Sequence, residues 1–165
     1  MSSTTSTLSS KTQWLLVATI VVVDQATKHW ALNRLSDGRT IDLVGSLRFN
    51  LAFNKGMAFS QATGLGPVIG ALGFVVVIAI VLWMRRSATG VAALAAGLVV
   101  AGALGNLIDR LFRGDAWLRG AVVDFIDLQW FPIFNVADSA ISIGAALMIV
   151  ASFRQGAKGA NVGNP

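Results

Sequence analysis

The chain has 165 residues, of which 55% are hydrophobic and only 13% are charged, and its mean hydropathy is +0.68. Because a soluble domain carries about a quarter charged residues, this composition indicates an integral membrane protein. With no cysteine and a single histidine, disulfides, cysteine nucleophiles and multi-histidine zinc sites are excluded, and we expect neither a metal nor a cofactor. The net charge of +5 is typical of loops that face anionic lipid. Without a basic patch or a recognition fold, we expect no nucleic-acid binding.

Hydrophobic runs long enough to cross a bilayer occur four times along the chain. They cover residues 12–32, 66–84, 88–110 and 136–153. The two ends, residues 1–10 and 155–165, lack this pattern and are expected to be flexible. The sequence therefore predicts a single integral membrane domain over residues 1–165, mainly α-helical, with four transmembrane helices.

The first run follows Lys11, as the hydrophobic part of a secretory signal peptide would. However, no small-residue cleavage site comes after it, and Asp24 and Lys28 do. We therefore interpret it as a spanning helix, in which these two residues lie four apart on one face. Because pairing lowers the cost of a charge inside a membrane, a purely structural ion pair remains one interpretation of them.

Residues 40–60 show a different pattern, in which apolar and polar side chains alternate. The apolar positions are odd-numbered: Ile41, Leu43, Leu47, Phe49, Leu51 and Phe53. A period of two is typical of a half-buried strand, so we expect a small β-sheet on the membrane surface with an apolar underside. Asn54 could then hydrogen-bond an extended peptide, and Gly56 would allow a tight turn. A plain strand-to-helix turn is the alternative.

Polar residues gather at one end of the predicted bundle. Asn106, Asp109 and Arg110 share one face near the end of the third run, which also contains small residues such as Gly105 that let membrane helices approach closely. If the four helices alternate in direction, these residues reach the same membrane surface as the second half of the first helix. This distribution favours chemistry at an interface over conduction through the membrane.

The connection between the third and fourth runs adds more polar groups at that surface. Asp124 lies within it, and Asn135 and Asp138 open the fourth helix. Simpler interpretations remain open, because Asn135 is a natural N-cap and Asp138 suits the helix dipole. Asp109 and Arg110 could likewise be interfacial anchors.

All eight acidic residues of the chain are aspartates, which limits the chemistry available for hydrolysis. Two carboxyl groups that lie close together share one proton, since both cannot easily ionise. The ionised group can then take a proton from water while the protonated group polarises a carbonyl. By this reasoning Asp24, Asp109, Asp124 and Asp138 are all candidates, and the residues alone do not select two of them.

Five motifs follow one another along the chain. They are Asp24-Gln-Ala-Thr-Lys28, Asn54-Lys-Gly-Met-Ala-Phe59, Gly105-Asn-Leu-Ile-Asp-Arg110, Val123-Asp-Phe125 and Phe134-Asn-Val-Ala-Asp-Ser139. In this order they resemble the motifs of the lipoprotein signal peptidase (signal peptidase II) family. The resemblance implies an aspartyl endopeptidase of the bacterial cytoplasmic (inner) membrane. Such an enzyme cleaves the signal peptide from diacylglyceryl-modified prolipoproteins just before the lipidated cysteine.

The resemblance also implies roles for individual residues. Asp124 and Asp138 would be the catalytic pair. The substrate-binding and supporting residues would be Asn54, Gly56, Gly105, Asn106, Asp109, Arg110, Asn135, Asp24 and Lys28. The termini would be cytoplasmic, and the site and the β-sheet would face the outer, extracytoplasmic side. We expect a monomer whose partners are lipidated prolipoproteins and membrane lipid.

Two other functions are compatible with a small polar-ended bundle. A proton-coupled transporter would relay protons through membrane carboxylates, but it would need an acid near mid-bilayer. A non-catalytic bundle could bind lipoproteins and release them uncut.

Overall fold

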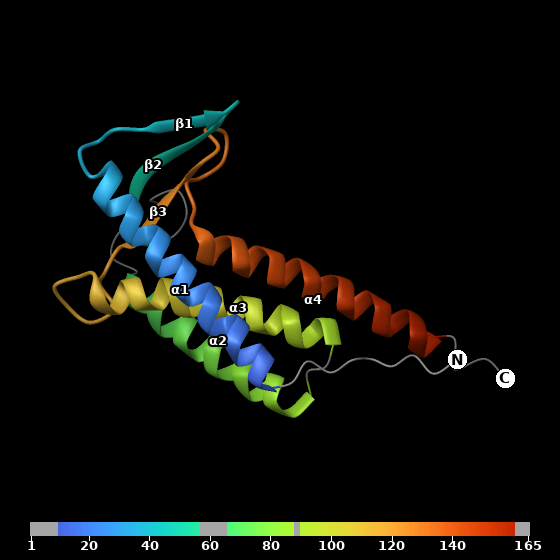
Figure 1. Cartoon of the computed structure of the whole chain (residues 1–165). Coiled ribbons are helices and arrows are strands. Elements are labelled where there is room, and N and C mark those ends of the chain that lie inside the picture. The colour runs from blue at the N-terminus through green and yellow to red at the C-terminus, as the bar shows by residue number, and fades with distance from the viewer. Residues whose placement is uncertain (1–9, 57–65, 88–89, 161–165) are drawn as a thin grey trace.

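The computed structural model describes residues 10–56, 66–87 and 90–160. Within them the chain forms four helices and one three-stranded sheet (Figure 1). In chain order the elements are α1 (Ser10–Leu35), β1 (Ile41–Val44), β2 (Leu47–Asn54), α2 (Gly66–Ser87), α3 (Gly90–Phe112), β3 (Val122–Asp127) and α4 (Val136–Ala160). The predicted fold class, a mainly helical protein with four apolar helices and a small sheet, is confirmed.

Each helix contains a stretch long and apolar enough to cross a membrane. The helices extend past the hydrophobic runs, and α4 continues to Ala160 although we expected a flexible end from residue 155. Backbone hydrogen bonding does not stop where hydrophobicity stops, so a polar turn can prolong a helix beyond the lipid. The other expected flexible residues, 1–9 and 161–165, lie outside the described residues, as do residues 88–89 of the third run.

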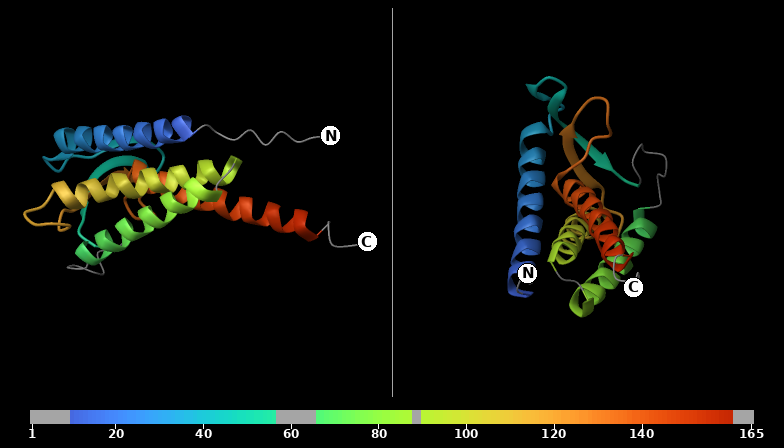
Figure 2. Two further views of the ribbon diagram at one scale, coloured as in Figure 1. Left: turned by 90° about the horizontal axis from the view of Figure 1, so that it is seen from below. Right: turned by 90° about the vertical axis from the view of Figure 1, so that its right-hand side faces the viewer.

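The central element is α3, which contacts α1, α2 and α4 (Figure 2). Its buried face consists mainly of alanine and glycine, so neighbouring backbones come unusually near. A Cβ added to Gly102 would lie 2.2 Å from the carbonyl oxygen of Ala137 in α4. The close α3–α4 contact fixes the first turn of α4 relative to the middle of α3.

The sheet lies at the end of the bundle away from the start of α1 and the end of α4 (Figure 1). Its strand order is β1-β2-β3, and both pairings are antiparallel. We did not expect β3, whose segment we took for a simple connection. Five of its six residues are buried, so the alternation that reveals a half-exposed strand is absent.

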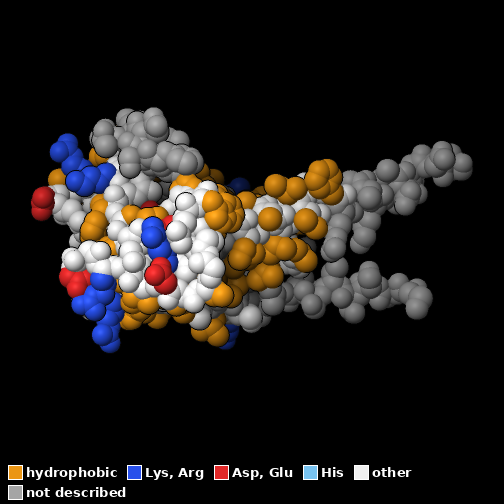
Figure 3. Space-filling view, turned by 90° about the horizontal axis from the view of Figure 1, so that it is seen from above, with side chains coloured by type: hydrophobic (Ala, Val, Ile, Leu, Met, Phe, Trp, Pro, Cys, Tyr) orange, Lys and Arg blue, Asp and Glu red, His pale blue; other side chains and the backbone are white. Residues whose placement is uncertain are grey.

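The apolar underside of the sheet is only partly as predicted. Phe49 and Leu51 pack against a buried cluster that includes Leu35 of α1 and Phe125 of β3. Leu43 and Phe53 instead lie exposed. β1 is an edge strand, and a bulge between Phe49 and Ala52 redirects the end of β2. Charged side chains gather at this end on the face seen in Figure 3, whereas apolar side chains cover much of the described helical part of that face.

Candidate active site

A cavity of about 1210 Å³ opens where α3 ends and α4 begins. It is lined by Ala52, Phe53, Asn54, Gly56, Asn106, Arg110, Val122, Asp124, Leu128, Gln129, Trp130, Phe131, Pro132, Ile133, Phe134, Asp138, Ser139, Ser142 and Ile143. One part of the lining is polar. The other part is an aromatic wall, which consists of Phe53, Trp130, Phe131 and Phe134. Of the four candidate carboxylates, Asp124 and Asp138 line the cavity, whereas Asp24 and Asp109 do not.

Asp124 is delivered to the cavity by β3, where its backbone pairs with Ala52 of β2. Its side chain is buried, and Asn135 Nδ2 donates a hydrogen bond of 2.6 Å to its Oδ1. Burial raises the pKa of Asp124 to about 7, and the nearby charge of Asp138 adds to this effect, while hydrogen bonds from Asn135 and Asn54 oppose it. A carboxyl group in these surroundings can hold a proton near neutral pH.

Asp138 lies in the first turn of α4 and forms a reciprocal cap with Asn135. The Asp138 amide donates to Asn135 Oδ1 at 2.9 Å, and the Asn135 amide donates to Asp138 Oδ2 at 3.2 Å. Asn106 Nδ2 donates to the other carboxyl oxygen, Oδ1, at 2.8 Å. The capping interpretation is thus correct, and the capped carboxylate also faces the cavity.

Asn135 joins the two carboxyl groups, because it binds Asp124 with its side chain and Asp138 with both backbone and side chain. Its Nδ2 also lies 3.3 Å from the carbonyl oxygen of Val123 and 3.2 Å from Asn106 Oδ1. Asn135 is fully buried, so these bonds hold β3 and α4 in one arrangement.

Lys28 is the centre of a buried charge network beneath the cavity. Its Nζ lies 2.9 Å from Asp24 Oδ2 and 2.9 Å from Asp109 Oδ2, and all three side chains are fully buried. It also donates to Asn106 Oδ1 at 3.0 Å. The ion pair expected between Asp24 and Lys28 is present, and it extends from α1 to α3.

The same network reaches the backbone on both sides of the cavity. Asp24 Oδ1 accepts the amide of Ala137 at 2.9 Å, and Asp109 Oδ2 accepts the amide of Val123 at 3.1 Å. A Cβ on Gly105 would lie 2.6 Å from Asp24 Oδ2. A glycine is therefore needed where α1 and α3 cross, and each carboxylate positions a residue adjacent to Asp124 or Asp138.

Arg110 differs from the interfacial anchor that we considered, because its side chain is buried and lines the cavity. Its Nη2 donates to the carbonyl of Gly56 at 3.1 Å, while its buried Nη1 has no hydrogen-bond partner among the described residues. The carboxylates of Asp124, Asp109 and Asp138 interact electrostatically with the guanidinium and offset part of the cost of its burial. Asp109 is also fully buried and is not an anchor either.

Gly56 lies in a turn held by a side chain, since its amide donates to Asn54 Oδ1 at 3.1 Å. Asn54 and Gly56 both line the cavity. Residues 57–60 of the expected surface segment lie outside the described residues.

Several residues of the site were missed in the sequence. Gln25 and Arg113 complete the buried network: Arg113 Nε donates to Asp109 Oδ1 at 2.6 Å, and Gln25 Nε2 lies 3.2 Å from the same oxygen. The spacing of four between Asp109 and Arg113 could have revealed the second pair. The aromatic wall was also missed, although a dense run of aromatic residues after β3 was visible.

The described residues contain no group of three or more His, Cys, Asp or Glu side chains placed to bind a metal ion. The polar side chains that they present to the cavity are two carboxyl groups, three amides, two hydroxyls and a guanidinium. Such an arrangement can exchange a proton with water and polarise a carbonyl group.

Solved structures share this architecture. Two structures described as bacterial membrane enzymes match the chain: the first with a TM-score of 0.81 and 30% identity, over 92% of this chain and 93% of that chain. The second has a TM-score of 0.76 and 31% identity, over 89% of this chain and 96% of that chain. By its fold, the chain is a multi-pass membrane protein with the architecture of these bacterial membrane enzymes.

The sequence identifies the kind of enzyme. The model of the signal peptidase (SPase) II family matches residues 16–154. The lipoprotein signal peptidase of Mycobacterium leprae (strain Br4923) is 42% identical over 139 residues, which are 83% of this chain and 69% of the relative. That of Rhodococcus jostii (strain RHA1) is 40% identical over 138 residues, or 83% and 70% of the two chains. The chain belongs to the signal peptidase II family and is an aspartic peptidase.

Proposed function

We propose that the protein removes signal peptides from diacylglyceryl-modified prolipoproteins, cutting just before the lipidated cysteine, and that Asp124 and Asp138 perform the hydrolysis. The observation that carries this proposal is that both carboxyl groups line one cavity and are bound by the same residue, Asn135. Family membership supplies the reaction class. The related enzymes named lipoprotein signal peptidase support the substrate class.

In this mechanism Asp124 carries the shared proton and Asp138 is ionised. Burial raises the pKa of Asp124 to about 7, whereas Asp138 accepts two N–H donors and lies on the first turn of a helix, where negative charge is favoured. Asp138 then takes a proton from the attacking water while Asp124 donates a hydrogen bond to the scissile carbonyl. When the tetrahedral intermediate collapses, the leaving amine receives a proton from the pair.

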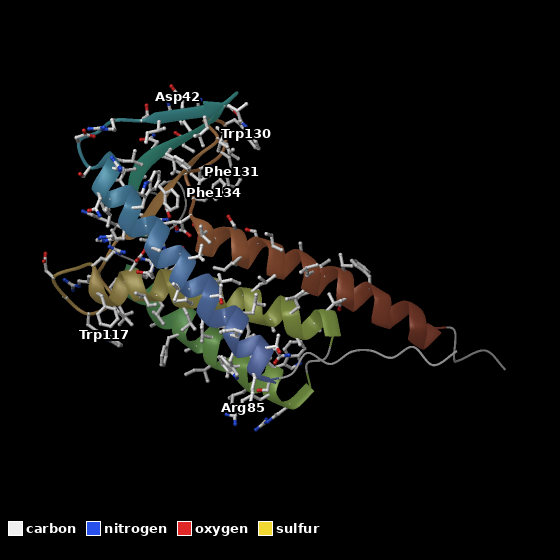
Figure 4. The ribbon with its side chains drawn as sticks, in the orientation of Figure 1. Asp42, Arg85, Trp117, Trp130, Phe131 and Phe134 are labelled. Carbon is white, nitrogen blue, oxygen red and sulfur yellow. The ribbon has the colours of Figure 1, made fainter. Side chains whose placement is uncertain are left out.

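The free hydrogen-bonding capacity of the cavity suits an extended peptide. Arg110 Nη1 is a buried donor without a partner among the described residues, and a substrate carbonyl would satisfy it. The aromatic wall would exclude water from the carboxyl groups once a substrate is seated, which strengthens the electrostatic interactions there. Phe131 and Phe134 of this wall are shown in Figure 4.

The orientation in the membrane follows from the same proposal. A lipoprotein is processed on the outer side of the cytoplasmic membrane, so the sheet and the cavity would face outward and the two termini inward. No partner subunit is needed for any residue of the cavity, and we propose that the enzyme acts as a monomer.

The test is cleavage of a synthetic lipidated peptide by the purified protein. Asp124→Asn and Asp138→Asn should each lower the turnover number by about a hundredfold to ten-thousandfold, the range that a general acid or base contributes. Asp115→Asn removes an exposed carboxyl group outside the cavity and should cleave like the unmodified protein. If either cavity variant folds and cleaves at the normal rate, the catalytic assignment is wrong.

A further inference from the structure

Every tryptophan of the chain is at least 36% exposed, although tryptophan is a large side chain that proteins usually cover. The residues are Trp14, Trp30, Trp83, Trp117 and Trp130. Each lies near a helix end or in a connection rather than in the middle of a span. Trp117 and Trp130 are the most exposed of them, at 76% and 74%.

Trp117 is displayed by a firmly built loop, residues 113–121, which we call the Trp117 loop. The neck of the loop is closed, because the Gly120 amide donates to the Arg110 carbonyl at 3.0 Å and a Cβ on Gly120 would lie 2.2 Å from the Asp109 carbonyl. The next residue, Leu118, is buried, with a φ of 57° in the left-handed region, and fits against Gly70 of α2. This conformation turns Leu118 inward while Trp117 remains outside.

Trp130 is presented by a second connection, residues 128–134, which we call the Trp130 turn. Its rings contact one another: Trp130 and Phe131 have centroids 6.0 Å apart, and Phe131 and Phe134 have centroids 5.9 Å apart. Gln129 fixes the turn, since its amide donates to Asp127 Oδ1 at 2.7 Å and its Nε2 donates to the Ser46 carbonyl at 3.0 Å. Both exposed tryptophans are therefore held in defined places.

Neither water nor the hydrocarbon core suits these two segments. The exposed rings would leave large apolar surfaces in water, which is unfavourable. The core of a bilayer does not accept lipid-exposed irregular backbone, and exposed Asp115 and Arg119 flank Trp117. The headgroup layer accommodates all of these groups, because the indole ring has an apolar body and a polar N–H.

The position of the two segments in the molecule agrees with this environment. The Trp117 loop directly follows α3, whose last residue, Phe112, is also exposed. In Figure 4, Trp117 and Trp130 lie toward opposite edges of the sheet-bearing end, while Arg85 lies at the other end of the bundle. The cavity lies at the sheet-bearing end, where the Trp130 turn forms part of its wall.

We propose that the Trp117 loop and the Trp130 turn anchor this end of the protein in the lipid headgroup layer and thereby hold the cavity at a fixed depth relative to the bilayer. The occupant of both surfaces is lipid, since they continue the apolar surface of helices that themselves cross the membrane. The proposal does not depend on which carboxyl groups are catalytic.

Tryptophan fluorescence in phosphatidylcholine vesicles tests the proposal. A variant that keeps only Trp117, with the other four tryptophans changed to Phe, is reconstituted with lipids brominated either near the headgroup or near the bilayer centre. We expect quenching at least about twofold stronger from the shallow bromines, and weaker acrylamide quenching than that of free tryptophan. The variant that keeps only Trp130 should give the same pattern.

The matched control is a tryptophan in the middle of a span. Val76→Trp, at an exposed position midway along α2, in a chain otherwise without tryptophan, should be quenched more strongly by the deep bromines. If the multiple substitutions impair folding, the unmodified protein is compared with Trp117→Phe instead. The decrease in quenching by the shallow bromines when Trp117 is removed gives the same information. Full acrylamide quenching of Trp117 without bromolipid quenching would mean that water or another protein faces it and would overturn the proposal, as would a preference for the deep bromines.

A separate measurement tests whether the Trp117 loop sets the depth of the cavity in the bilayer. The variant that keeps only Trp130 carries Phe at position 117, and replacing that Phe with Ser removes the aromatic anchor. The ratio of shallow to deep quenching of Trp130 should then change by about twofold, because interfacial aromatic residues set how a bundle sits in the bilayer. The reference variant, with Phe at position 117, keeps an aromatic ring and should retain the stronger shallow quenching of Trp130. An equal ratio in all variants would show that the loop does not set the depth.

Discussion

Asn106 illustrates how single atoms orient the site. Its Oδ1 accepts hydrogen bonds from Lys28 Nζ and from Asn135 Nδ2. Both of these nitrogen atoms can only donate. The amide of Asn106 must therefore point its Nδ2 at Asp138, as observed. Lys28 thus orients the Asn106 amide so that its Nδ2 faces the Asp138 carboxylate, although Lys28 does not line the cavity itself.

The raised pKa of Asp124 predicts how stability depends on pH. An unfolded aspartate has a pKa of 3.8, whereas the folded value is about 7. Between these values the folded chain binds the proton more tightly, so the free energy of unfolding falls as the pH rises from about 4 to about 7 and then levels off.

Asp124→Asn removes this titration. Relative to the unmodified protein it should become more stable as the pH rises through this window, by at most about 4 kcal/mol, while its activity is lost. Midpoints of thermal unfolding in detergent, measured at about pH 5 and about pH 8, would test this. Equal pH dependence of the two proteins would mean that Asp124 is not protonated in the folded state.

The buried charge network predicts a large effect for Lys28→Met. The substitution leaves Asp24 and Asp109 buried without their shared cation, and losing one partner of a buried pair costs about 3–5 kcal/mol. The thermal midpoint should fall steeply. Arg39→Met, which breaks the exposed pair with Asp37, should leave the midpoint nearly unchanged. Equal midpoints for the two variants would show that the buried network contributes little.

At the scale of elements, the contact between α3 and α4 makes a second kind of prediction. Gly102→Ala places a methyl group 2.2 Å from the Ala137 carbonyl, which is backbone and cannot move alone. The first turn of α4 would shift together with Asp138, so stability should fall by about 1–3 kcal/mol and cleavage should fall with it.

Gly73→Ala in α2 is the matched control, because nothing lies within 4 Å of the added Cβ. It should match or slightly exceed the unmodified protein in stability, since alanine favours a helix. If Gly102→Ala behaves in the same way, the α3–α4 contact does not hold Asp138 in place.

The sequence shows some elements better than others, for physical reasons. Long uncharged runs predict the four helices because lipid requires them, and the hairpin follows from its alternation. β3 was missed because it is covered on both faces, which removes its periodicity. Helix ends were misplaced because hydrophobicity reports the thickness of the lipid, not the extent of hydrogen bonding.

Within the site, spacing within one helix predicts neighbours such as Asp24 and Lys28, which do form a pair. It does not predict contacts between helices, such as Lys28 with Asp109 or Asp24 with the Ala137 amide. Residue chemistry left four carboxylates as candidates, and the family resemblance pointed to Asp124 and Asp138. The folded arrangement then places these two at the cavity and the other two beneath it. The aromatic wall was missed because aromatic residues in a connection have no single structural meaning.

At the scale of the whole molecule, the absence of cysteine makes the proposed orientation directly testable. Single cysteines at Ser36, near the sheet, and at Arg85, at the opposite end, are both exposed positions. In intact cells an impermeant maleimide should label Ser36→Cys, and Arg85→Cys should be labelled only after the membrane is opened. The reverse pattern would place the cavity on the inner side.

The double role of Asn135, which caps α4 and binds both carboxyl groups, bears on how the enzyme could escape an inhibitor. Asn135 lies behind the cavity lining, so a mutation there would alter a bound drug's contacts only by loosening the start of α4 and shifting Asp124 and Asp138, the proposed catalytic pair. Phe53, which lines the cavity with a largely exposed side chain, is freer to vary. Compounds that bind mainly to the polar part of the cavity lining should therefore stay effective longer than those that bind mainly to the aromatic wall.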